Sequence, residues 1–147
     1  MNALNPFVIF SAWNPHCSDA INEDLMVTMG HQIEARGFIH ARVMLVDNML
    51  GERPAFIVPL PNHERLAAVP YLYQLARHYA QPSVLYVDAN RLASMVDLAE
   101  GRGGPDVERE TILGKFEGIT PMESALRAQF YRDMHGFVYA INPGSTS

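Results

Sequence analysis

The sequence has few of the features that build cross-linked or membrane-spanning proteins. Its only cysteine is Cys17, so no disulfide can form within the chain, and such sparse cysteine is typical of a reducing compartment. No apolar run approaches the roughly 18 residues that a transmembrane helix needs. Residues 1–6 lack the basic cluster that opens a secretory signal. We therefore expect a cytoplasmic protein with no membrane partner.

Charge and potential metal ligands are also sparse. Charged residues make up 18% of the chain, and 16 acidic against 11 basic residues give a net charge of −5. An acidic surface repels phosphate backbones, so we expect no nucleic-acid partner. No two of the six histidines stand three or four residues apart, so no helix face presents a ligand pair, and we expect no metal site.

The usual nucleophile and phosphate motifs are missing as well. The chain has no Gly-x-Ser-x-Gly elbow, which a serine hydrolase would carry. Cys17 beside His16 is a weak thiolate candidate, because sequence neighbours seldom face each other at working geometry. The glycines in 101–105 lack the spacing of a phosphate loop, so we interpret that stretch as a flexible loop.

What is present is a single domain of 147 residues, 48% of them hydrophobic, with an expected ordered core at about 6–142. Apolar periodicity and turn residues predict a strand, a helix, two strands, a helix and a strand. Their expected ranges are 7–10, 19–36, 38–46, 55–58, 63–79 and 82–87. Pro70 either kinks the second helix or begins a shorter one. This βαββαβ order predicts an α+β, ferredoxin-like fold with a mostly antiparallel sheet and both helices on one face.

The remaining chain predicts a β extension of that core. Residues 92–96 are a short strand or a turn, 111–116 and 137–141 are strands, and 124–132 is a short helix. We expect residues 143–147 to form a disordered tail. A sheet with helices on one face leaves the other bare, and association of several chains would cover it.

Three residues at strand ends attract attention as site candidates. Glu52 stands at the entrance to the apolar strand 55–58, although a carboxylate there is more often a solvated turn residue. Asp88 ends the strand 82–87, where open sheets hold ligands, but before Asn90 it also forms turns. Trp13 ends the first strand and offers either core packing or a π-face for a cation or a purine.

The order of short motifs resembles the small phage-encoded S-adenosylmethionine (SAM) hydrolases, now described as SAM lyases. The resemblance covers about residues 8–141, and each motif in it is short. It rests on Val8-Ile-Phe-Ser11-Ala12-Trp13, Asp19 and Asn22, Glu52, Gln81-x-x-Val84-Leu85, Gly114-x-Phe116 and Ala125-Leu126. The opening Ser11–Pro15, with Glu52 and Gln81, is also similar to a family of uncharacterised small bacterial domains, which leaves the function open.

The resemblance implies cleavage of SAM to 5′-methylthioadenosine and homoserine lactone or homoserine, without a cofactor. It also implies a PII-like homotrimer with SAM between subunits, and a role against methylation-dependent restriction. The sulfonium is a good leaving group that the substrate's own carboxylate can displace, so preorganisation supplies most of the catalysis. This chemistry is compatible with a sequence that lacks a metal motif and a triad.

The resemblance also assigns roles to residues. Glu52 is the catalytic candidate, which holds the substrate's ammonium or ribose hydroxyls. Ser11, Ala12, Trp13, Asn22, Val87 and Asp88 are expected to bind the nucleoside, and Gly114 and Phe116 to close the pocket. Two rival functions remain: a PII-like protein that binds a nucleotide without turnover, and a small inhibitor from a mobile element.

Overall fold

The computed structural model describes residues 5–60, 65–98 and 109–145. The strands are β1 (Phe7–Phe10), β2 (Ala41–Asp47), β3 (Gly51–Pro59), β4 (Ser83–Val87), β5 (Leu92–Asp97), β6 (Arg109–Ile119), β7 (Gln129–Asp133) and β8 (Val138–Asn142). The helices are α1 (Asp19–Ala35), α2 (Arg65–His78) and α3 (Pro121–Ser124), with a 3-10 turn, η2, at Pro143–Ser145. No helix in these described ranges is long and apolar enough to cross a membrane.

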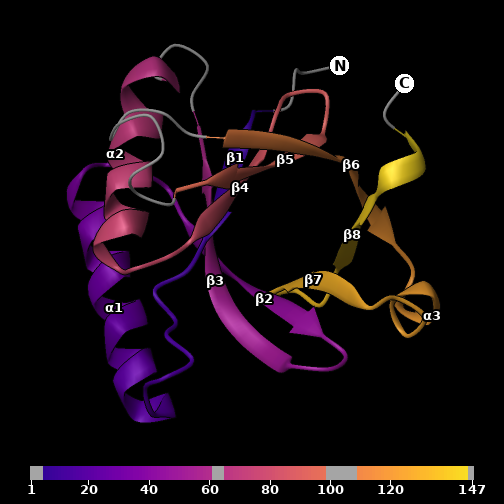
Figure 1. Ribbon diagram of the computed structural model, residues 1–147, viewed down its shortest axis with the longest axis horizontal. Coiled ribbons are helices and arrows are strands. Elements are labelled where there is room, and N and C mark those ends of the chain that lie inside the picture. Colours follow the sequence, from indigo (N-terminus) through magenta and orange to yellow (C-terminus); the bar gives the residue numbers. More distant parts are fainter. Residues whose placement is uncertain (1–4, 61–64, 99–108, 146–147) are drawn as a thin grey trace.

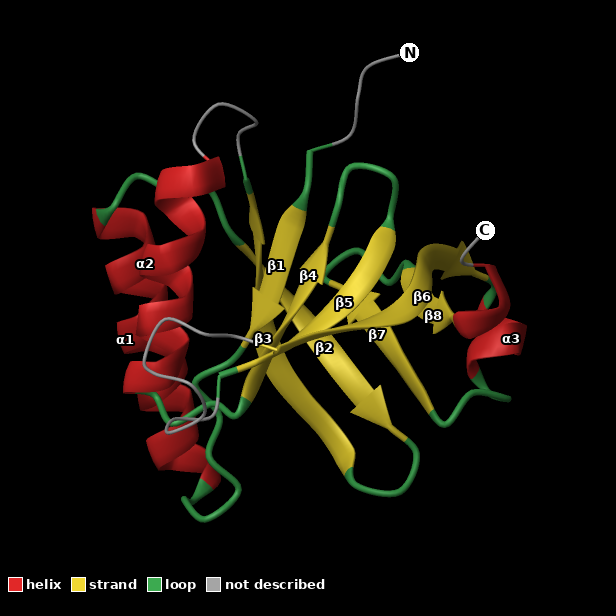
Figure 2. Cartoon of the chain, turned by 45° about the horizontal axis from the view of Figure 1, so that its top comes forward, coloured by secondary structure: helices red, strands yellow, loops and turns green. Residues whose placement is uncertain are grey.

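The strands form one closed antiparallel barrel. Their order around it is β1-β3-β2-β7-β8-β6-β5-β4, and β4 pairs with β1 to complete the circle. Figures 1 and 2 show α1 and α2 side by side against one flank of the barrel, with the short α3 on the far side. Each strand of this closed barrel has a paired neighbour on both sides along at least part of its length.

The predicted ferredoxin-like fold is therefore wrong. The βαββαβ elements exist, but the four later strands are not an extension of an open sheet. Instead β5 pairs with β4, β7 pairs with β2, and β6 and β8 join these two edges. The order of elements along a chain does not distinguish an open sheet from one that later strands close. Closure also removes the bare sheet face from which we expected association.

The apolar run of β1 has two separate burial partners. Val8 and Phe10 belong to the cluster that packs under the helices, together with Met26, Met29 and Leu72. Phe7 and Ile9 point the other way, into the barrel interior, where Val43, Leu85 and Phe116 meet them. Alternate residues of a strand face opposite sides. A strand covered on both sides therefore has no polar position, which is why residues 7–10 are continuously apolar.

The two long helices follow the sequence pattern closely. Ser18 caps α1, since its hydroxyl accepts a hydrogen bond from the Ile21 amide at 3.2 Å. The buried face of α1 consists of Asn22, Met26, Met29, Gly30 and Ile33, which recur at the spacing of one helix face. Pro70 lies inside α2, which excludes a helix that begins there.

The C-terminal third differs from its prediction in one element. The expected helix at 124–132 is wrong: α3 ends at Ser124, and Gln129 begins strand β7. Thr120 caps the earlier turn by accepting from the Glu123 amide, with Pro121 at the first helical position. Phe130 is buried from strand β7 against Val46 and Val138, whereas Leu126 is 85% exposed.

Other expectations in this region have mixed outcomes. Residues 92–97 form strand β5, and the strands predicted at 111–116 and 137–141 are parts of β6 and β8. Residues 143–145, expected in a disordered tail, form η2. The glycine-rich stretch 101–105, the first two residues of the second predicted helix and residues 146–147 lie outside the described residues.

Candidate functional site

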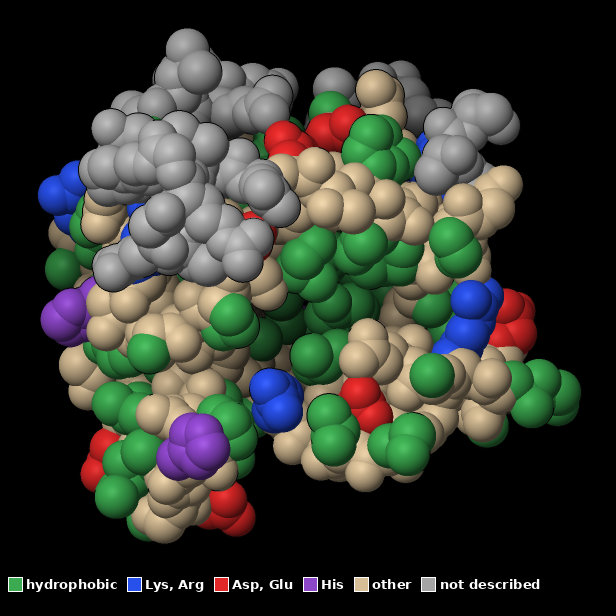
Figure 3. All heavy atoms as spheres, in the orientation of Figure 1, with side chains coloured by type: hydrophobic (Ala, Val, Ile, Leu, Met, Phe, Trp, Pro, Cys, Tyr) green, Lys and Arg blue, Asp and Glu red, His purple; other side chains and the backbone are tan. Residues whose placement is uncertain are grey.

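The barrel interior contains a cavity of about 650 Å³ at the end where β1 begins and β3 ends. We call it the wide cavity. Its apolar walls include Phe7, Ile57, Phe116 and Tyr139. On the one face of the molecule that Figure 3 shows, the middle of the barrel is hollowed, and mainly hydrophobic side chains surround the hollow. An eight-stranded barrel is either filled by its side chains or holds one small ligand, and ligand pockets span roughly 300–1,000 Å³.

A smaller cavity of about 160 Å³ lies toward the opposite end of β3, and we call it the narrow cavity. Ser11, Arg53, Gln81 and Tyr131 contribute to its lining. Its volume is below the usual range for ligand pockets, roughly 300–1,000 Å³. Within one chain it therefore has room for only part of a nucleoside.

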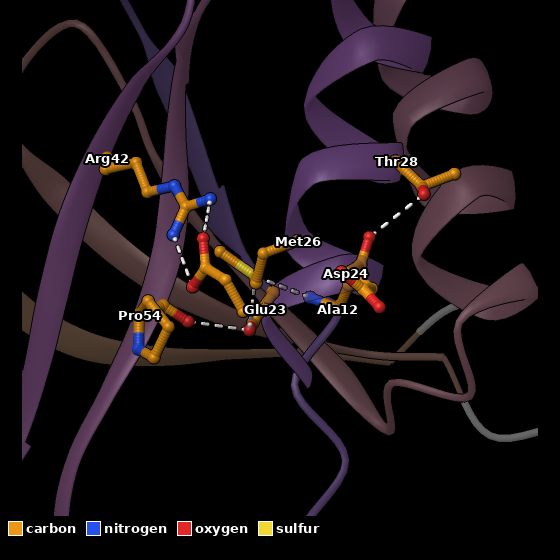
Figure 4. Close-up of polar contacts among 8 residues, drawn as sticks. Ala12, Glu23, Asp24, Met26, Thr28, Arg42 and Pro54 are labelled. Atoms are coloured by element: carbon orange, nitrogen blue, oxygen red, sulfur yellow. Dashed lines mark hydrogen bonds and ion pairs between the residues drawn. The ribbon is translucent and has the colours of Figure 1, made fainter. Parts of the chain in front are cut away.

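The segment Ser11–Trp13 is built into the fold at this end. The buried Ser11 hydroxyl donates to the Pro54 carbonyl of β3 at 2.7 Å and accepts from the Trp13 amide at 2.9 Å. The Ala12 amide contacts the Met26 sulfur at 3.5 Å, which Figure 4 shows beside it. Gln81 donates its side-chain amide to the Trp13 carbonyl at 3.1 Å. These contacts hold the Ser11–Trp13 segment against three others that are distant from it in the sequence.

Asn22 holds the loop that follows this segment. Its side-chain oxygen accepts from the Asn14 amide at 2.7 Å, and its amide nitrogen donates to the carbonyls of Asn14 and Cys17 at 2.9 and 3.3 Å. Asn22 is 1% exposed, so its amide group is fully committed inside the protein. In this structure Asn22 positions the loop rather than offering its side chain to a ligand.

Glu52 lies on the outer surface at the start of β3. Its carboxylate accepts from the Arg132 guanidinium at 2.6 Å, and 48% of its side chain is exposed. The carboxylate lines neither the wide nor the narrow cavity. Two residues further along β3, however, Pro54 receives the Ser11 hydroxyl. Glu52 is thus next to the Ser11–Trp13 segment but on the outside of the barrel.

The turn before Glu52 is fixed by Asp47. Its carboxylate accepts from the amides of Met49 and Leu50 at 2.8 and 2.9 Å, and from the side chain of Gln129. The hydrogen bond from Gln129, followed by those from the two amides, lowers the pKa of Asp47. This pattern sets the hairpin geometry and hence the register that places Glu52 opposite Val46.

Val87 and Asp88 have structural surroundings. Val87 is fully buried in the barrel interior. The Asp88 carboxylate accepts from the amides of Asn90 and Leu92, both at 2.9 Å, and so shapes the β4–β5 turn. Neither side chain contributes to the lining of the wide or the narrow cavity. The turn interpretation of Asp88 therefore describes what its carboxylate does.

Gly114 and Phe116 lie two residues apart on β6 with different roles. Gly114 stands at a register shift against β5, with φ +141°, and packs against the backbone of Asn142 and Pro143. The missing side chain of Gly114 thus lets the backbone at Asn142 and Pro143 approach, rather than a ligand. Phe116 lines the wide cavity, edge-on to Phe7 at 5.3 Å and stacked on Tyr139 at 5.5 Å. Phe116 is the one predicted site residue in that cavity's lining.

The sequence analysis missed the polar groups around the wide cavity. They are Arg42, Arg91, Asp133 and His135, which come from β2, the β4–β5 turn and the end of β7 with the turn after it. Arg42 and Arg91 are far from each other in the sequence and far from Asp133 and His135. Only closure of the barrel, which brings β7 beside β2 and β5 beside β6, gathers them around one cavity.

Tyr131, which lies between Phe116 and the narrow cavity, provides a pH-dependent prediction. Burial raises the pKa of its phenol from 10 to about 12. The folded protein therefore disfavours the phenolate relative to the unfolded chain. The part of the unfolding free energy that depends on neutral Tyr131 is fully present below pH 10 and is lost as the pH rises toward 12. Two pKa units correspond to about 2.7 kcal/mol. Denaturant unfolding at pH 9 and near pH 12 should show a smaller loss of unfolding free energy for Tyr131→Phe than for the parent.

The comparison corrects for the other tyrosines, because burial also raises the pKa values of Tyr79 and Tyr139 in both proteins. Equal losses for Tyr131→Phe and the parent would show that the Tyr131 phenol ionises freely in the folded state.

Neither a group of metal ligands among the described residues nor a matching protein family identifies a site in this chain. In the described ranges, no three His, Cys, Asp or Glu side chains are grouped closely enough to hold a metal ion. Cys17 is a free, half-buried thiol. Comparisons with protein families and with curated proteins find no match for the chain.

Proposed function

We propose that the protein cleaves SAM to 5′-methylthioadenosine and homoserine lactone, or homoserine. The observation that carries the proposal is the meeting of the motif segments at one end of the barrel. Ser11 bonds to Pro54, near Glu52, and Gln81 bonds to Trp13, although these segments are far apart in sequence. Of the motifs that resemble the SAM lyases, Ser11–Trp13, Glu52 and Gln81 thus form one contiguous region. Gly114 and Phe116, which the resemblance assigned to the same pocket, lie elsewhere in the barrel and are not part of this proposed site.

The reaction asks little of this region beyond orientation. A carboxylate oxygen of SAM attacks its own γ-carbon, the carbon–sulfur bond breaks, and the electron pair neutralises the sulfonium. Holding the methionyl arm in the folded conformer supplies the catalysis, and such preorganisation contributes roughly 7–11 kcal/mol. Glu52 binds the substrate's ammonium or ribose hydroxyls in place of its present partner Arg132. Water opens the lactone to homoserine in a later step.

The proposed site is completed by a second copy of the chain, in the trimer that the resemblance implies. The narrow cavity has a volume of only about 160 Å³, and the Glu52 carboxylate lies outside it. Beside Glu52, the hairpin tip exposes 92% of Met49 and 76% of Leu50. Exposed apolar side chains at a hairpin tip suit burial against another subunit.

Product analysis tests the proposal directly. The purified protein is incubated with SAM, and the mixture is chromatographed for 5′-methylthioadenosine, with boiled protein as the control. We expect methylthioadenosine to accumulate, and NMR of the same mixture to distinguish lactone from homoserine. Binding of SAM without product would favour the nucleotide-binding alternative, and absence of both would refute the proposal.

A further inference from the structure

The wide cavity has several aromatic rings in its wall. Phe116 and Tyr139 stack at an interplanar angle of 15°, and Phe7 meets Phe116 edge-on. Two small residues, Ala41 and Gly118, stand among the larger wall residues and leave room beside them. A planar aromatic ring gains most from such walls, since offset stacking and edge-to-face contacts both favour flat π-systems.

Arg91 supplies a positive charge at the wide cavity. Its guanidinium donates to the Asn5 carbonyl at 3.0 Å and lies 5.2 Å from the centroid of the Phe7 ring. No ion pair joins Arg91 to a carboxylate within the described part of the chain. A guanidinium has five N–H donors in a planar fork, so donors remain for a ligand oxygen.

The other charged groups at the cavity are already engaged. The Asp133 carboxylate accepts from the amides of His135 and Phe137 and from the Tyr139 hydroxyl, at 2.9 to 3.1 Å. The Arg42 guanidinium forms a two-bond pair with Glu23, which Figure 4 shows on the helix side of the barrel. Arg91 lies close enough to Asp88 for the two charges to interact but forms no ion pair with it, so among the described residues its guanidinium is the cation most available to a ligand in the cavity.

We propose that the wide cavity binds a small planar aromatic molecule that carries one anionic group. The ring lies against Phe7, Phe116 and Tyr139, and the anion accepts hydrogen bonds from Arg91. This site is separate from the proposed SAM site, because Glu52 and Pro59 lie at opposite ends of β3. The proposal does not depend on SAM cleavage.

A matched pair of fluorescent probes tests it. 8-Anilinonaphthalene-1-sulfonate carries one sulfonate on a planar naphthalene ring system, and N-phenyl-1-naphthylamine has the same rings without the charge. Both should gain fluorescence on titration into folded protein, with the sulfonate bound more tightly. Arg91→Gln should weaken the sulfonate roughly tenfold or more, as expected for a charge-assisted contact, and leave the neutral probe within about twofold. Arg91→Lys should recover part of the affinity.

A second variant tests the cavity independently of Arg91. Gly118→Leu should fill part of the wide cavity and weaken the binding of both probes by roughly tenfold or more, because a leucine side chain occupies space that the rings need. Arg36→Gln, which removes a cation that lies over Tyr71 on the helix side, is the control and should change neither affinity. Circular dichroism confirms that each variant is folded.

The proposal is supported if Arg91→Gln weakens binding of the sulfonate alone and Gly118→Leu weakens binding of both probes. Affinities unchanged in both variants, or no binding to the folded parent, would overturn it. Equal weakening of both probes by Arg91→Gln would refute the assigned role of the anion. SAM turnover should be the same in Arg91→Gln as in the parent.

Discussion

Glu52→Gln should lower SAM turnover by at least about a hundredfold, because losing one well-placed electrostatic contact costs roughly 3–4 kcal/mol. The substitution keeps the shape of the side chain and removes its charge, so the substrate's ammonium loses its partner. The melting temperature should barely move. The ion pair to Arg132 is exposed at both ends, and such pairs contribute about 0–1 kcal/mol.

A matched control exists in Glu23, which forms a comparable exposed ion pair with Arg42 on another part of the surface. Glu23→Gln should retain the parental turnover. Initial rates of methylthioadenosine release, measured beside melting curves for both variants, provide the comparison. Parental activity in Glu52→Gln would reduce Glu52 to a turn residue, whereas equal loss in both variants would point to a general effect of surface charge.

Local elements were predictable because their signals are local. The predicted strand at 7–10, the helix at 19–36 and the strands at 38–46 and 55–58 correspond to the observed β1, α1, β2 and β3. Strand pairing has no such signal. The contact of β2 with β7, and of β6 with β8, depends on side chains that meet only after the sheet curls. An open sheet and a closed barrel therefore share the same local pattern.

The candidate site shows the same division. The resemblance selected Asn22 because of its spacing, but a spacing does not show whether an amide faces a ligand or the protein's own loop. In the structure it bonds to Asn14 and Cys17. Arg91 gave no sequence signal, because a single arginine in a turn is ordinary. Its significance comes from Phe7, which the barrel places within 5.2 Å of it.

Gly114→Ala should be the most destabilising small substitution in the barrel wall. Its φ of +141° disfavours any side chain, and a Cβ there would lie 2.6 Å from Pro143 Cα and closer still to the Asn142 carbonyl oxygen. Both obstacles are backbone atoms, which cannot rotate away as a side chain would. We expect a loss of about 3 kcal/mol or more, and a melting temperature lower by at least about 6 °C.

Two other glycines separate the causes. Gly37→Ala shares the positive φ, at +82°, but has no atom within 4 Å of its Cβ, so only backbone strain of roughly 1–2 kcal/mol should appear. Gly118→Ala has ordinary φ and no atom nearer than 4.0 Å, and its stability should stay close to the parent's. If Gly114→Ala loses no more unfolding free energy than Gly37→Ala, η2 can move away from β6 at little cost. A much larger loss would mean that the backbone around Gly114 cannot move. The relative positions of β5, β6 and β8 in the closed barrel would then require a residue without a side chain at the register shift.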